Sequence, residues 1–180
     1  MSQPALIIRR ADTSDAATPE TVERIVAIIN EAYRWSEAEQ WTDEKTRTEH
    51  AEVSLLLTNQ KMLLAYADNT LAGVVKIEEI APGIGGFGML ATDPDGLKKG
   101  VGRALVAEAE AWGRAMRFAE MEIEIVRAES PNAHKILLHE WYTRLGYIEQ
   151  ETYPIAERIP EIAALQRLTC VSTVYRKPLN

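Results

Sequence analysis

The sequence has little that would build a disulfide-linked, metal-binding or membrane-spanning protein. It contains one cysteine, Cys170, in 180 residues, so it cannot form an intrachain disulfide, and we expect a reducing compartment. Its three histidines lack the spacing of metal ligands, and we predict no metal. No apolar run approaches the roughly 18 residues of a spanning helix, and residues 1–10 lack the apolar core of a signal peptide. We therefore predict a cytoplasmic protein that does not enter a membrane.

Positive charge is also scarce. Lys and Arg number 20 against 27 Asp and Glu, which gives a formal net charge of -7. Such a surface disfavours non-specific binding to nucleic acid and favours small cationic partners. The hydrophobic fraction of 46% is enough for the core of an ordinary domain, and neither a disordered composition nor sustained heptads appear. We expect residues 1–180 to form one globular domain.

Hydrophobic periodicity predicts a mixed α/β domain. Alternating or β-branched runs predict strands, and spacings near 3.6 residues predict helices. Pro19 follows Thr18 at a predicted helix start, and Gly146 ends the last predicted helix in a left-handed conformation. The order of elements favours a mixed, mostly antiparallel sheet of about seven strands flanked by about four helices. Strands are expected at 5–10, 62–67, 71–80, 89–92, 120–126, 147–153 and 168–176, and helices at 19–34, within 36–57, at 100–117 and from 130 to 145.

The first glycine-rich segment gives a misleading signal. Gly83, Gly85 and Gly88 have the G-x-G-x-x-G spacing of a dinucleotide-binding fingerprint. In that fingerprint the third glycine opens a helix, whereas residues 89–92 have the pattern of a strand. We therefore expect a flexible connection between antiparallel strands instead.

The second glycine-rich segment, residues 94–103, joins a predicted strand to a predicted helix. Unpaired backbone amides at a helix start, the helix dipole and nearby cations together suit an anion such as a phosphate. The segment is not a Walker P-loop, because it lacks the G-x-x-x-x-G-K-[ST] pattern. A solvated turn with exposed lysines is the alternative interpretation.

Two segments carry a family resemblance. Residues 90–94 (LATDP) with 97–102 (LKKGVG) resemble the coenzyme A signature of the GCN5-related N-acetyltransferases, and residues 141–147 (WYTRLGY) resemble that family's helix-to-strand segment. The resemblance covers nearly the whole chain and implies acetyl-coenzyme A as cofactor. Family members usually carry Arg or Gln where this chain has Leu97, so a side-chain contact to the cofactor is absent there. The implied cofactor-binding residues are Leu90, Ala91, Thr92, Leu97, Lys98, Lys99, Gly100, Val101, Gly102 and Arg103.

The same resemblance implies direct attack of an amine on the thioester, with no covalent enzyme intermediate. Tyr142 matches the tyrosine that protonates the departing thiolate, although its apolar helical surroundings alone would make it a core residue. A backbone N–H near Leu90 or Ala91 is the implied oxyanion donor. Cys170 lies in a β-rich run, where a buried structural thiol is the better interpretation.

The general base is left open by the sequence. A carboxylate should accept the amine proton, directly or through water. Glu79 and Glu124 rank together ahead of Glu122, and each also fits a salt-bridged strand residue. The resemblance also implies an acceptor pocket between the first helices, the hairpin and the last strands, with Tyr33, Trp35, Trp41 and Tyr153 as candidate lining residues.

These observations predict an N-acetyltransferase that acts on the primary amine of a small molecule or peptide. The alternative is a catalytically silent protein of the same fold that binds coenzyme A or a partner. A transferase for longer acyl chains is a third hypothesis. We also expect a homodimer formed through exposed sheet edges, as is common in this family.

Overall fold

The computed structural model describes residues 6–42, 46–94 and 100–179. Within these ranges no helix is both long enough and apolar enough to cross a membrane. The elements follow one another as β1 (Leu6–Arg10), α1 (Thr13–Ala16), α2 (Pro19–Glu37), α3 (His50–Thr58), β2 (Met62–Ala67), β3 (Thr70–Ala81), β4 (Ile84–Thr92), α4 (Val101–Ala115), β5 (Glu120–Ala128), α5 (Ala133–Arg144), β6 (Ile148–Pro154), α6 (Ile155–Arg158), the 3₁₀ helix η2 (Pro160–Leu165) and β7 (Cys170–Pro178).

One seven-stranded sheet organises the molecule, with the strand order β1-β2-β3-β4-β5-β7-β6. Neighbouring strands are antiparallel except β4 and β5, which are parallel and are connected by α4. A parallel pair needs such a crossover, because the chain must return to the same end of the sheet. The structure confirms the predicted mixed, mostly antiparallel sheet.

The two faces of the sheet have separate hydrophobic cores. On one face α4 and α5 pack on the strands, with Leu105, Met121 and Tyr147 fully buried. On the other face α2 and α3 cover β2, β3 and β4, with Ile29, Leu57 and Leu64 fully buried. This second face of the sheet continues over β5, β7 and β6, where shorter segments cover it instead of α2 and α3. These segments are α6, η2 and the chain around Trp41.

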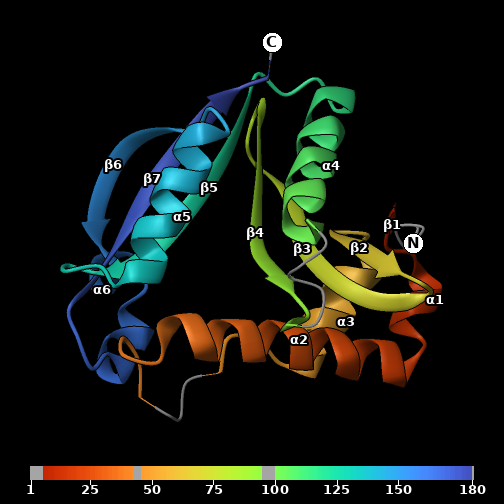
Figure 1. Ribbon diagram of the computed structural model, residues 1–180, viewed down its shortest axis with the longest axis horizontal. Helices are drawn as coiled ribbons and strands as arrows, with labels where there is room; N and C mark the ends of the chain where they lie inside the picture. The colour runs from red at the N-terminus through yellow and green to blue at the C-terminus, as the bar shows by residue number, and fades with distance from the viewer. Residues whose placement is uncertain (1–5, 43–45, 95–99, 180) are drawn as a thin grey trace.

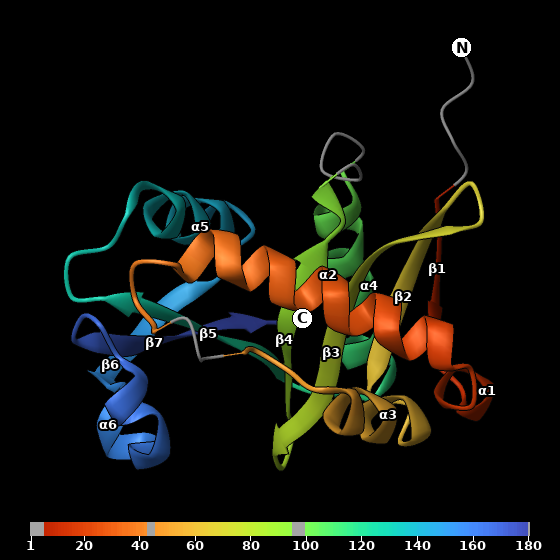
Figure 2. The same cartoon turned by 90° about the horizontal axis from the view of Figure 1, so that it is seen from below.

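The parallel strands β4 and β5 separate along their length. Their pairing covers only Ile84 to Gly86 of β4 and Glu120 to Glu122 of β5. Beyond these residues the two strands diverge, with α4 and α5 on either side and α2 running beneath their separated ends (Figure 1). Seen from below, α2 passes β3 and β4 and its C-terminal end reaches α5 (Figure 2).

Several local predictions are confirmed at the residue level. Asp68 and Asn69 both have positive φ, at 50° and 63°, and join the paired residues Ala67 and Thr70. This is the type I′ geometry whose twist matches a hairpin. Gly146 has a φ of 95° after α5, and the Cys170 side chain is buried.

Other boundaries differ from the predictions. The glycine-rich segment 83–88 is not a flexible connection, because β4 already begins at Ile84. Helix α5 begins at Ala133 rather than at residue 130, since the Asn132 side chain accepts the backbone N–H of Lys135 and caps the helix there. Periodicity also missed α1, α6 and η2, because such short helices show no full hydrophobic repeat.

Candidate functional site

A β-bulge lies where β4 leaves β5. Val74 pairs with Ala91 and Lys76 pairs with Gly88, so Val75 of β3 lies opposite both Met89 and Leu90. Met89 has a φ of 50°, in the left-handed region that side chains rarely adopt. A bulge of this kind interrupts the ladder and re-aims the local backbone. Of the sequence-predicted residues, Leu90 therefore lies within the bulge, and Ala91 and Thr92 pair again with β3 beyond the point where pairing with β5 has ended.

The N-terminus of α4 lies beside the end of β4. Gly100 has a φ of 70°, and among the described residues no side chain caps the helix. The first-turn amides of Val101, Gly102 and Arg103 have no acceptor within the helix, as at any helix start. A Cβ built on Gly102 would lie 3.7 Å from the Thr92 methyl group, which places the helix start against β4.

The other predicted cofactor residues are Val101 and Arg103, which the structure describes, and three residues that it does not. The Val101 side chain is buried in the core, so only its backbone can face a ligand, whereas Arg103 is exposed. Leu97, Lys98 and Lys99 lie outside the described residues.

Tyr142 projects from α5 into an aromatic cluster. Its ring lies 4.7 Å from that of Trp141, 5.7 Å from Tyr147 and 6.2 Å from Phe87, measured between centroids. Burial raises the pKa of the Tyr142 phenol well above its ordinary value of 10.0, and the nearby Tyr33 phenol adds to the rise. Tyr142 therefore keeps its proton at neutral pH.

Tyr33 reaches this region from α2 on the opposite face. Burial raises the pKa of its phenol, and the Arg47 guanidinium and the backbone amide of Met89 offset part of that rise. The Arg47 guanidinium also lies 5.0 Å from the centre of the Tyr33 ring. The hydroxyl of Tyr33 is thus brought near both the β4 bulge and Tyr142, an arrangement that helical spacing did not predict.

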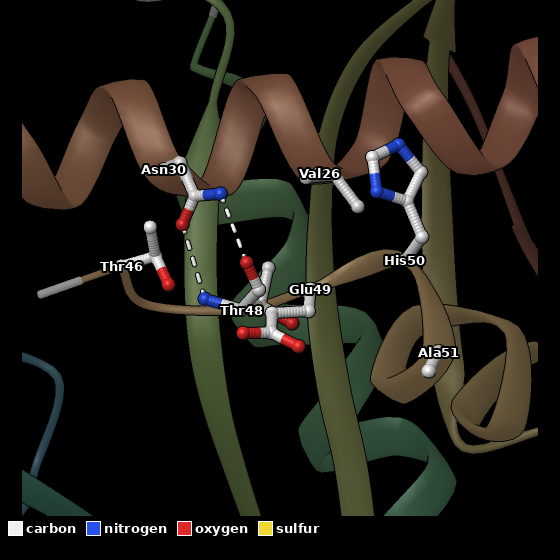
Figure 3. Close-up of a pocket in the computed structure, with 7 residues that line it drawn as sticks. All are labelled: Val26, Asn30, Thr46, Thr48, Glu49, His50 and Ala51. Atoms are coloured by element: carbon white, nitrogen blue, oxygen red, sulfur yellow. Dashed lines mark hydrogen bonds between the residues drawn. The ribbon is translucent and has the colours of Figure 1, made fainter.

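Asn30 fixes the segment that carries Arg47. Its Oδ1 accepts the backbone N–H of Arg47. The same oxygen accepts the Thr48 N–H, and Nδ2 donates to the Thr48 carbonyl at 3.0 Å (Figure 3). These bonds border a cavity of about 390 Å³ between α2 and the start of α3. The cavity is lined by Val26, Asn30, Thr46, Thr48, Glu49, His50 and Ala51, none of which is a sequence-predicted site residue.

The three candidate carboxylates occupy different places. Glu79 lies at the β3–β4 hairpin, opposite Gly85, and accepts the Gly83 N–H, so the structure does not bring it to the diverging ends of β4 and β5. Glu122 pairs with Arg176 at 2.7 Å. Glu124 follows two residues after the last β5 residue paired with β4, and it is therefore placed at the divergence.

The candidate lining residues also separate. Trp35 is 74% exposed and packs edge-on against His134, 4.9 Å away. Trp41 is buried with Ile155 and donates its Nε1–H to Glu37 at 2.7 Å, so its role is packing. Tyr153 donates its hydroxyl to Glu124 and stays near the site.

Three participants near these groups were missed by sequence reasoning. Ser172 and Arg158 contact Glu124, and Lys135 forms a buried pair with Glu37. Alternation along β7 places Ser172 and Arg176 on one face, but nothing local shows which strand lies beside β7. Within the described ranges no group of three or more acidic, histidine or cysteine side chains could hold a metal.

Comparisons with known proteins bear on the family and the fold. The sequence profile described as the Acetyltransferase (GNAT) family matches residues 22–147. The chain belongs to the GNAT family. No curated protein sequence is similar enough to serve as a relative.

Solved GNAT-like structures match over almost their whole length. The PaiA N-acetyltransferase from Thermoplasma acidophilum, in complex with coenzyme A, is 17% identical with a TM-score of 0.65, covering 97% of this chain and 99% of that one. YncA from Salmonella typhimurium, with its cofactor acetyl-CoA, is 19% identical with a TM-score of 0.67, covering 98% and 95%. The ribosomal-protein-alanine N-acetyltransferase from Brucella melitensis is 18% identical with a TM-score of 0.66, covering 96% and 99%. At these identities the likeness establishes the GNAT fold.

Proposed function

We propose that this GNAT-family chain is an acetyl-CoA-dependent N-acetyltransferase. It would transfer the acetyl group to the primary amine of a small molecule or peptide by direct attack, without a covalent enzyme intermediate. The observation that carries the proposal is the bulge at Met89, which frees β4 backbone at the point where β5 has already separated. In a member of this family, such backbone suits an extended ligand arm added alongside β4.

The residues present fit the cofactor. A Cβ built on Gly88 or Gly100 would meet no atom within 4 Å, so there is open space beside the backbone at the bulge and at the start of α4. The first-turn amides of α4 would hold the phosphates, and residues 90–92 would hold the extended arm. When bound, acetyl-CoA supplies an acetyl thioester that is already activated toward amines.

Two side chains are suited to handle protons. The Tyr142 phenol holds its proton on Oη at neutral pH and is the proposed donor to the leaving sulfur. The Glu124 carboxylate, at the separation of the strands, is the proposed acceptor of the amine proton. Glu79 lies at the hairpin and is the weaker candidate.

Thermal stability with acetyl-CoA tests cofactor binding. A ligand that binds only the folded state must raise the melting temperature. Gly102→Glu should fold, because a carboxylate in the first helical turn is favourable and the site has room, yet its charge should repel phosphate and abolish the shift. Gly102→Ala is the matched control and should keep the shift. A retained shift in Gly102→Glu would refute phosphate binding at α4.

Release of free thiol with a panel of amines then tests turnover. Tyr142→Phe should bind acetyl-CoA normally but release thiol more slowly, by roughly 10²- to 10⁴-fold, as expected when a general acid is lost. Cofactor binding without thiol release for any amine would instead indicate the silent binding protein.

A further inference from the structure

The Glu124 carboxylate is held in one orientation by two hydroxyl groups. Its Oε2 accepts the Tyr153 hydroxyl at 2.5 Å and the Ser172 hydroxyl at 2.9 Å. Ser172 is fully buried on β7, and Tyr153 stands on the neighbouring strand β6. Both donors act on the same oxygen, so Oε1 remains to face a cation.

A cation of the chain itself already occupies that position. The Arg158 guanidinium lies 3.0 Å from Glu124 Oε1, stands 4.8 Å from the centre of the Tyr153 ring, and donates to the Tyr153 hydroxyl. A carboxylate, an aromatic face and fixed hydroxyls are the groups that hold an ammonium or guanidinium ion. The occupant shows that this cluster of Glu124, Tyr153 and Ser172 accepts a cation.

Arg158 is a weakly held occupant. Its side chain is 54% exposed and ends the four-residue helix α6. Exposed ion pairs contribute only about 0–1 kcal/mol, so a ligand cation can compete with it. Glu124, by contrast, keeps the buried Ser172 hydroxyl when the arginine leaves.

The cluster faces the side of β5 opposite Tyr142. Ile123 and Ile125 point into the core that contains Tyr142, so Glu124 between them points to the other face. Val126, two residues further along that face, packs with Ile155 and Trp41 and offers an apolar surface. A cationic amine with an apolar body therefore has matching surfaces beside the diverging strands.

We propose that the Glu124–Tyr153–Ser172 cluster binds the ammonium group of the acceptor, and that Arg158 fills this site until a cationic amine displaces its guanidinium. The proposal deepens the proposed function and rests on it for the identity of the ligand as an acceptor. It makes Arg158 a competitor of the substrate rather than one of its ligands.

Binding measured by calorimetry without acetyl-CoA tests the proposal directly. The probe is 2-phenylethylamine, a cation at pH 7, and 2-phenylethanol is its neutral analogue. Arg158→Gln should tighten amine binding by about fivefold. This factor corresponds to the loss of a competing surface ion pair at the strong end of the energies measured for exposed pairs. Glu124→Gln should weaken it by about tenfold or more, since the carboxylate that would pair with the ammonium group is lost. Tyr153→Phe should weaken it by a smaller factor and serves as a second variant.

The matched control is Arg144→Gln, which removes another exposed arginine paired with a glutamate, Glu140, at 3.6 Å. It should leave amine binding unchanged, which separates competition at the site from the change in net charge. The proposal is overturned by unchanged or weaker binding in Arg158→Gln, by equal binding of the amine and the alcohol, or by no saturable binding in any variant.

The outcomes also separate this proposal from the proposed function. Amine binding with the expected pattern, but no thiol release from acetyl-CoA, would refute the transferase and leave the cation site standing. Thiol release together with an unaltered amine affinity in Arg158→Gln would refute the cation site alone.

Discussion

The buried ion pair between Lys135 and Glu37 joins α5 to α2, two of the helices around the separated strands. The Lys135 ammonium lies 2.7 Å from one Glu37 oxygen, and the two side chains are only 5% and 7% exposed. Trp41 Nε1 donates to the other oxygen at 2.7 Å. Lys135→Met should therefore leave the Glu37 carboxylate buried without its cation, with the hydrogen bond from Trp41 still in place.

The expected cost follows from the two ways in which the protein can respond. Removing one partner of a buried ion pair typically costs about 3–5 kcal/mol. Alternatively, the buried glutamate can take up a proton, which costs about 3.7 kcal/mol at pH 7 for an ordinary glutamate. This cost sets an upper limit on the stability lost in the variant. We expect a loss of about 3–4 kcal/mol at pH 7, which shrinks by about 1.4 kcal/mol for each pH unit of acidification.

Urea denaturation at pH 7 and pH 5 measures these losses. At pH 7 the midpoint of Lys135→Met should fall by roughly 1.5 M, at a slope of about 2–3 kcal/mol/M. The double variant Lys135→Met with Glu37→Leu should recover most of the stability, because apolar replacement of a buried pair is often neutral. Arg144→Met is the exposed control and should cost less than about 1 kcal/mol. A loss below about 1 kcal/mol at pH 7, or one that is the same at pH 5, would refute this reasoning.

Two further predictions concern packing and acid stability. Gly85→Ala would place its Cβ 2.5 Å from the Phe118 ring and should lower the free energy of unfolding by about 1–3 kcal/mol in the same urea titration. Gly88→Ala is the control: its Cβ would meet no atom within 4 Å, and the free energy of unfolding should change by less than about 0.5 kcal/mol. The hydrogen bond from the Arg9 guanidinium holds the pKa of Asp15 below its ordinary value of 3.8. The pair therefore stabilises the fold above that pH, and the contribution is lost as the pH falls through the folded-state pKa. In Asp15→Asn the free energy of unfolding should depend less on pH in acid, and an unchanged dependence would contradict this reasoning.

Much of the fold was predictable because its signals are local. The helical spacing of Val22, Ile25 and Ile29 gave α2, and the turn residues Asp68 and Asn69 gave the β2–β3 hairpin, since periodicity and turn geometry need only neighbouring residues. The family motifs likewise assigned Tyr142 and the start of α4 to a candidate site.

The bulge at Met89 has no local signal. It depends on the register between β3 and β4, and a register is set by the pairing of whole strands. The same pairing makes Gly85 and Gly86 strand residues. At Gly85 the Phe118 ring packs where a Cβ would lie, a contact that the glycine spacing does not reveal.

The sequence by itself determined the order of the strands and of the longer helices, the family, and the residue types available for chemistry. It could not separate Glu79 from Glu124, because the family has no fixed position for the base and a strand pattern does not show which strands lie side by side. Only the tertiary structure separates their positions, since the partial pairing of β4 with β5 puts Glu124 at the divergence and Glu79 at the hairpin. It also brought Arg158 to Glu124, a contact between residues from different elements that no local periodicity encodes.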